Sequence, residues 1–154
     1  MRILGIDPGI AITGYALLDI QNDNITLVSS GSIRTDKNKA TPDRLVELYS
    51  DISEIIKTFK PDVAAIEQLF YFKNLKTIIP VAQARGVITM ALAQNKIETA
   101  EYTPLQVKQT ITGFGRATKD EVKQMTQLAL NVPMPKLDDT VDAIAIALCH
   151  LRMN

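Results

Sequence analysis

The first 33 residues of the chain hold three strand-length segments whose connections are too short to contain a helix. Residues 2–6 are an apolar run that ends at the turn sequence Asp7-Pro8-Gly9, and residues 14–20 and 25–33 form two further strand-like segments. Strands joined this tightly pair in an antiparallel meander, because parallel neighbours need a crossover of a dozen or more residues. The sequence therefore predicts three antiparallel strands at the start of the fold.

After residue 40 the pattern changes to alternating helices and strands. Thr41 as a cap and Pro42 at the first helical position open a helix to residue 59, with apolar residues at three- and four-residue spacing. Strands are expected at residues 63–66 and 97–102, and helices at 77–94, 104–110, 119–130 and 138–151. This order predicts an α/β fold with a mixed five-stranded sheet, three antiparallel strands followed by parallel ones, flanked by helices.

Composition limits the class of protein further. A chain of 154 residues has the size of one domain, and 46% hydrophobic with 22% charged residues is typical of a globular protein. The single cysteine, Cys149, excludes an internal disulfide and a multi-cysteine metal site. No apolar run approaches the ~18 residues that a membrane span needs. We expect one soluble domain over residues 1–154, located in the cytoplasm and without a membrane contact.

The charges are distributed unevenly along the chain. Lys and Arg together number 17, as do Asp and Glu, so the net charge is zero. Residues 68–119 nevertheless carry 7 basic and 2 acidic groups, a net charge of +5, and residues 68–97 carry no acidic group. A solvated helix face normally mixes its signs, so this basic stretch is a candidate anion-binding surface.

Four carboxylates occupy positions that suggest a common site. Asp7 and Glu67 each end a predicted buried strand, and the carboxyl ends of neighbouring parallel strands meet at one sheet edge. Asp139 and Asp142 are three residues apart and share a face of the last predicted helix. Asp138 and Asp142 also share a face, so the spacing leaves open whether Asp138 or Asp139 joins the site; Asp138 is alternatively a helix cap.

Such a cluster would repel itself unless cations neutralised it. Oxygen-only ligands favour Mg²⁺ or Mn²⁺ over zinc, and two divalent ions would balance four carboxylates. Two such ions can activate water and stabilise the leaving oxygen of a phosphodiester. The sequence therefore predicts two Mg²⁺ ions, replaceable by Mn²⁺, held by Asp7, Glu67 and Asp142 together with either Asp139 or Asp138.

Basic and aromatic residues near these acids are candidates for nucleic-acid binding. Phe70 follows Glu67 closely and begins a run of three aromatic residues beside Lys73 and Lys76, as expected of a surface that stacks unpaired bases. Further basic residues surround the glycine-rich segment 113–115 and suggest phosphate contacts. The DNA-contact candidates are Phe70, Lys73, Lys76, Lys108, Arg116 and Lys119.

Several motifs together resemble those of the RuvC family, the bacterial Holliday-junction resolvases. The likeness covers essentially the whole chain in order, through residues 5–9, 13–16, 65–68, 83–86, 106–109 and 139–143. The resemblance implies an RNase H-like fold, a homodimer paired through the helix at 77–94, and Mg²⁺-dependent cleavage of four-way DNA junctions in recombination and repair. It also implies contact with the RuvA–RuvB branch-migration complex.

The same resemblance implies roles for individual residues. It assigns the four metal-binding carboxylates to Asp7, Glu67, Asp139 and Asp142, and so prefers Asp139 to Asp138. It assigns base stacking to Phe70, and a catalytic role next to the phosphate to Lys108 and Lys119.

Three other readings compete with this one. An actin-like ATPase or sugar kinase shares the Gly5-Ile6-Asp7-Pro8-Gly9 turn, but it needs about twice this length and a second Asp-Gly phosphate motif that is absent. A non-catalytic junction-binding module would tolerate loss of the carboxylates, and all four are present. A superfamily relative that acts on another nucleic acid is harder to separate, because it uses the same carboxylate chemistry.

Overall fold

The computed structural model of the protein describes residues 1–22, 24–69 and 75–154. Its elements follow the predicted order of three strands and then alternating helices and strands. They are β1 (Arg2–Asp7), β2 (Ile12–Gln21), β3 (Asn24–Arg34), α1 (Thr41–Phe59), β4 (Val63–Glu67), α2 (Leu75–Gln94), β5 (Glu98–Tyr102), α3 (Pro104–Thr112), α4 (Lys119–Leu130) and α5 (Asp138–Met153).

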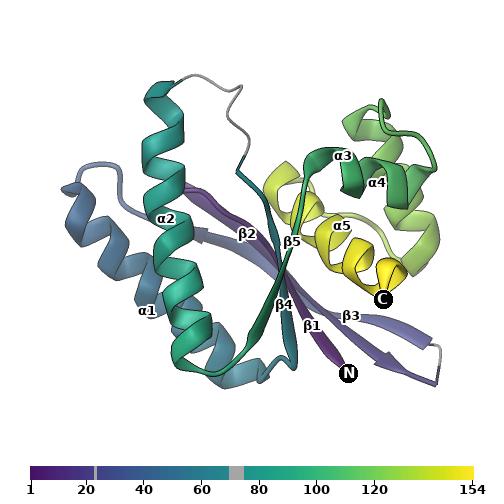
Figure 1. Ribbon diagram of the computed structural model, residues 1–154, viewed down its shortest axis with the longest axis horizontal. Coiled ribbons are helices and arrows are strands. Elements are labelled where there is room, and N and C mark those ends of the chain that lie inside the picture. Colours follow the sequence, from purple (N-terminus) through teal and green to yellow (C-terminus); the bar gives the residue numbers. More distant parts are fainter. Residues whose placement is uncertain (23, 70–74) are drawn as a thin grey trace.

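The strands form one mixed sheet in the order β3-β2-β1-β4-β5. β1, β2 and β3 pair antiparallel, whereas β4 is parallel to β1 and to β5, as the sequence predicts. Helices α1 and α2 lie on one side of the sheet and α3, α4 and α5 on the other (Figure 1). The sheet is therefore the middle of three layers.

Alternation along the strands builds a separate core on each face of the sheet. In β1, Ile3 belongs to the core under α5, whereas Leu4 and Ile6 belong to the core under α1 and α2. In β4, Ala65 faces α5 and Ile66 faces the opposite core. Because successive side chains point to opposite faces, both central strands are apolar at almost every position.

Helix α5 lies against the middle of the sheet because glycine and alanine leave room for it. A Cβ atom added to Gly5 would lie 2.1 Å from the backbone oxygen of Ala143 and 2.8 Å from the Cβ of Ala147. Residues Thr140–His150 of this helix are buried except Asp142. A helix buried on nearly every side explains why its sequence is apolar around most of its circumference.

Short capping motifs in the sequence mark the starts of two helices. Thr118 and Glu121 form the predicted capping box at the start of α4, and Thr103 and Gln106 form a second one at the start of α3. The prediction of Thr41 as a cap is wrong: Thr41 is already helical, Ala40 occupies the cap position, and no side chain caps that end. Within the described residues, no helix is long and apolar enough to cross a membrane.

Replacing Gly5 by alanine tests the close contact between α5 and β1. We expect Gly5→Ala to lower the free energy of unfolding by about 3 kcal/mol, because the new methyl group meets a backbone oxygen that cannot move alone. Urea unfolding followed by circular dichroism measures this change. Gly31→Ala is the matched control, since its Cβ would meet only the Tyr15 side chain, at 3.0 Å or more. Equal stability of the two variants would contradict the argument.

Candidate active site

Asp7 and Glu67 lie at the same edge of the sheet and on the same face. β1 and β4 are parallel neighbours with Ile6 paired to Ile66, so the next residue of each strand is one of the two acids. By the alternation of the strands, both carboxylates point to the side that α5 covers. Two acids are thus fixed next to each other by strand pairing alone.

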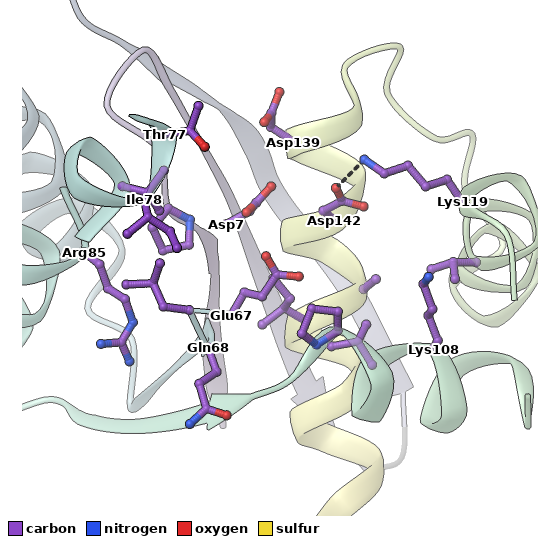
Figure 2. Close-up of a pocket in the computed structure, with 18 residues that line it drawn as sticks. Asp7, Glu67, Gln68, Thr77, Ile78, Arg85, Lys108, Lys119, Asp139 and Asp142 are labelled. Atoms are coloured by element: carbon purple, nitrogen blue, oxygen red, sulfur yellow. Dashed lines mark hydrogen bonds and ion pairs between the residues drawn. The ribbon is translucent and has the colours of Figure 1, made fainter. Parts of the chain in front are cut away.

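The first turns of α5 bring Asp139 and Asp142 to this edge. Gly14 pairs with Asp7 across β1 and β2, and a Cβ atom at Gly14 would lie 1.9 Å from the backbone oxygen of Asp139. The missing side chain at Gly14 therefore lets the start of α5 lie directly over the strand that neighbours Asp7. In Figure 2 the Asp7 carboxylate lies between those of Glu67 and Asp139, with Asp142 beside it.

These four acids line one cleft of about 530 Å³ between α2 and the group of α3, α4 and α5. Asp138, the alternative to Asp139, is exposed and does not line the cleft. It does not cap the helix either, because Leu137 holds the cap position and no side-chain cap bond forms there. The structure therefore places Asp139 with Asp142, as the resemblance implied.

Lys108 of α3 and Lys119 of α4 line the same cleft. The Lys119 ammonium donates a hydrogen bond to the Asp142 carboxylate with 3.4 Å between Nζ and Oδ2 (Figure 2). The Lys119 side chain is 71% exposed. Two basic groups thus approach the cleft from the helical side, opposite the acids at the strand ends.

The carboxylates shift each other's protonation. Burial, and next the charges of Glu67, Asp142 and Asp139, raise the pKa of Asp7 to about 8. Burial also raises the pKa of Asp142, although Lys119 opposes that change. The Asp142 carboxylate in turn raises the pKa of Lys119. Burial, together with the three neighbouring acids, thus favours the protonated form of Asp7.

The acids fit a hard divalent cation in donor type and charge. All four offer oxygen only, and after burial the charges of the other three acids raise the pKa of Asp7 while Lys119 opposes them. Among the residues that the structure describes, no three His, Cys, Asp or Glu side chains are close enough together to hold a metal ion as placed. Binding one would therefore require side chains of the cleft to rotate toward one another.

The remaining predicted contact residues lie outside the cleft or outside the described part of the chain. Arg116 and Lys76 are exposed and do not line it. Phe70 and Lys73 fall within residues 70–74, which lie outside the described residues. His150 shares a buried hydrogen bond of 2.7 Å with the hydroxyl of Tyr102.

Sequence reasoning missed several residues of the cleft wall. Arg85 of α2 lines the cleft and forms an ion pair with Glu101 of β5. This ion pair links α2 to the strand at the edge of the sheet. The place of Arg85 in the basic stretch and in the motif at 83–86 was the available signal. Gln68, Thr77 and Ile78 also line the cleft; Gln68 belongs to the motif at 65–68, whereas Thr77 and Ile78 belong to no motif that could have revealed them.

Comparison with known proteins gives a consistent result. The family model of "Crossover junction endodeoxyribonuclease RuvC" matches residues 3–150. The protein of that name from Fusobacterium nucleatum is 49% identical over 99% of this chain and 80% of its own length. Its counterpart from Caldanaerobacter subterraneus is 44% identical over 100% of this chain and 94% of its own length.

A solved structure extends the likeness to three dimensions. RuvC of Thermus thermophilus, in complex with a Holliday junction substrate, superimposes with a TM-score of 0.93 and 28% identity. The match covers 99% of this chain and 94% of the other. The mixed sheet and its helices are accordingly an RNase H-like fold.

The raised pKa of Asp7 predicts how the stability of the metal-free protein depends on pH. The folded state retains this proton up to about pH 8, whereas the unfolded chain releases it near 3.8. The folded state binds more protons between these values, so the free energy of unfolding contributed by Asp7 falls as pH rises through them. Asparagine cannot ionise, so a protein with asparagine at position 7 does not lose stability in this way as the pH rises.

We therefore expect Asp7→Asn to raise the melting temperature in EDTA, by a small amount at pH 5 and by roughly 5 °C at pH 8. Differential scanning calorimetry at both pH values measures the difference. Asp120→Asn, on the exposed first turn of α4, is the control without a cleft contact. A gain for Asp7→Asn that did not grow with pH would show that Asp7 is ionised in the empty cleft.

Proposed function

The chain belongs to the RuvC family of crossover junction endodeoxyribonucleases, and from this we propose that it resolves four-way DNA junctions by paired nicks in two strands of like polarity. Such an activity serves homologous recombination and DNA repair. The proposal rests mainly on one cleft. It is lined by four carboxylates from β1, β4 and α5 and by two lysines from α3 and α4.

Asp7, Glu67, Asp139 and Asp142 would hold divalent cations in this cleft, two per subunit, with Mg²⁺ as the natural ion and Mn²⁺ as a substitute. Divalent cations supply Lewis acidity to hydrolysis of a phosphodiester, at the attacking water and at the leaving oxygen. Asp7 and Glu67 form the rigid half of the ligand set, because paired strands fix their backbones. Asp139 and Asp142 join from α5.

The two lysines would orient the DNA backbone against the acids. Lys108 and Lys119 line the cleft from α3 and α4, so a phosphate in the cleft meets positive charge next to the four acids. Lys119 is mostly exposed and its contact with Asp142 is long, so its ammonium can transfer to a phosphate at little cost. We expect a 5′-phosphate product.

A homodimer would explain why the two cuts are paired. An isologous dimer presents two equivalent clefts to a junction with twofold symmetry. Helix α2 offers a face for the partner: Ile79 is 64% exposed and Met90 47% exposed, and a Cβ atom at Gly86 would meet nothing within 4 Å. Small residues on this face would allow the α2 helices of the two subunits to approach each other closely. A cytoplasmic location and contact with the RuvA–RuvB complex stay predictions.

Replacing Asp7 tests the catalytic proposal. We expect Asp7→Asn to reduce cleavage of a synthetic four-way junction in Mg²⁺ at least a thousandfold, while junction binding in Ca²⁺ or EDTA changes less than threefold, because the lost group is a metal ligand and not a phosphate contact. Denaturing gels and fluorescence anisotropy measure the two quantities.

Linear duplex and an RNA–DNA hybrid serve as substrate controls, and Asp120→Asn as the protein control. Cleavage by Asp7→Asn at the wild-type rate would remove Asp7 from the mechanism. Preference of the wild type for the hybrid over the junction would instead favour a superfamily relative with another substrate.

Charge placed on the exposed face of α2 tests the dimer. We expect Met90→Glu to convert a dimer into a monomer of unchanged thermal stability, because glutamate there is solvated in the monomer and unpaired in the interface. Light scattering after size exclusion gives the mass, and supercoiled cruciform DNA distinguishes single from paired nicks. Val46→Glu on α1, at a position 67% exposed, is the matched control. A wild-type mass for Met90→Glu would place the interface elsewhere.

A further inference from the structure

The turn between α3 and α4 carries an aromatic side chain that lies outside the packed cores. Phe114 is 58% exposed and belongs to neither core cluster. Leu105, 61% exposed, lies next to the same turn, since a Cβ atom at Gly115 would come within 2.7 Å of its Cδ1. Two large apolar side chains are thus exposed close to one turn, and an exposed apolar patch of this kind points to contact with another molecule.

This turn is rigidly built. Gly113 ends α3 in the left-handed conformation at φ 78°, and its carbonyl accepts a hydrogen bond of 2.9 Å from the Gln109 side chain. The Thr112 hydroxyl bonds both the amide and the carbonyl of Phe114 at 3.0 Å. The amide of Ala117 donates to the Phe114 carbonyl at 3.1 Å. The backbone that presents the ring is therefore fixed before any partner arrives, which lowers the entropic cost of binding.

The charges around the turn favour a polyanion as that partner. Lys108 and Lys119 lie on either side of it in the sequence and line the cleft, Arg116 next to Phe114 is exposed, and residues 108–119 contain no acidic side chain. A DNA strand that enters the cleft between the acids and the two lysines meets α3 and α4 there, and these helices continue into the tip. An apolar ring beside exposed cations suits the alternating sugar–base and phosphate surfaces of DNA.

We propose that the tip at residues 113–116 is a second DNA-binding site, in which Phe114 packs on the sugar–base surface of a junction arm and Arg116 pairs with its phosphates. The inference rests on the proposed function, because it extends the same bound junction beyond the catalytic cleft.

Binding measurements separate the two contacts. We expect Phe114→Ala to weaken junction binding in Ca²⁺ about tenfold with an unchanged slope of log affinity against log salt. Arg116→Ala should flatten that slope by about one. Leu128→Ala, at a position 73% exposed on α4, is the matched control and should bind as the wild type does. Melting temperatures should stay unchanged, because neither Phe114 nor Leu128 belongs to a core cluster.

The absence of tryptophan from the chain provides an independent readout. Phe114→Trp introduces a single indole at the tip, and we expect a junction to quench its fluorescence and to protect it from acrylamide. The same probe at Leu128→Trp should stay accessible. Wild-type affinity for Phe114→Ala, or an indole at position 114 that acrylamide still reaches in the complex, would overturn the second site. Wild-type protein that neither bound nor cut the junction would instead overturn the proposed function.

Discussion

The contact between α5 and the antiparallel part of the sheet determines the rest of the structure. Gly5 and Gly14 lack the side chains that would separate the helix from the strands, and Ala143 and Ala147 keep the facing side of the helix small. Because the helix lies this close, its first turns reach the end of β1 and carry Asp139 and Asp142 to Asp7. One packing relationship therefore closes the core and assembles the acidic side of the cleft.

The acids at the strand ends and the lysines of the cleft are held in place in different ways. Strand pairing fixes Asp7 and Glu67 through the backbone, so their separation depends on the hydrogen-bonded register of β1 and β4. The lysines, in contrast, stand on α3 and α4, which pack against α5 and do not join the sheet. The backbones of Asp7 and Glu67 are thus held more firmly than those of the two lysines.

Much of this arrangement was predictable from the sequence because the informative residues obey simple local rules. Strand-length apolar segments with short connections predicted the three antiparallel strands, and a capping box located the start of α4. Carboxylates after buried strands indicated the site. Arg85 was harder to find, because its place in the cleft depends on how α2 packs across the sheet. Gly14 was also hidden, since its importance comes from the Asp139 backbone far along the chain.

The positions of the acids in the chain have a consequence for synthesis. Asp7 and Glu67 leave the ribosome early, whereas Asp139 and Asp142 belong to the last helix, which fills the space above Gly5 and Gly14. A nascent chain that still lacks α5 therefore has only two of the four acids of the cleft, and one face of its sheet is uncovered. The complete cleft therefore forms only after α5 has packed on the sheet, so an incompletely synthesised chain does not yet have it.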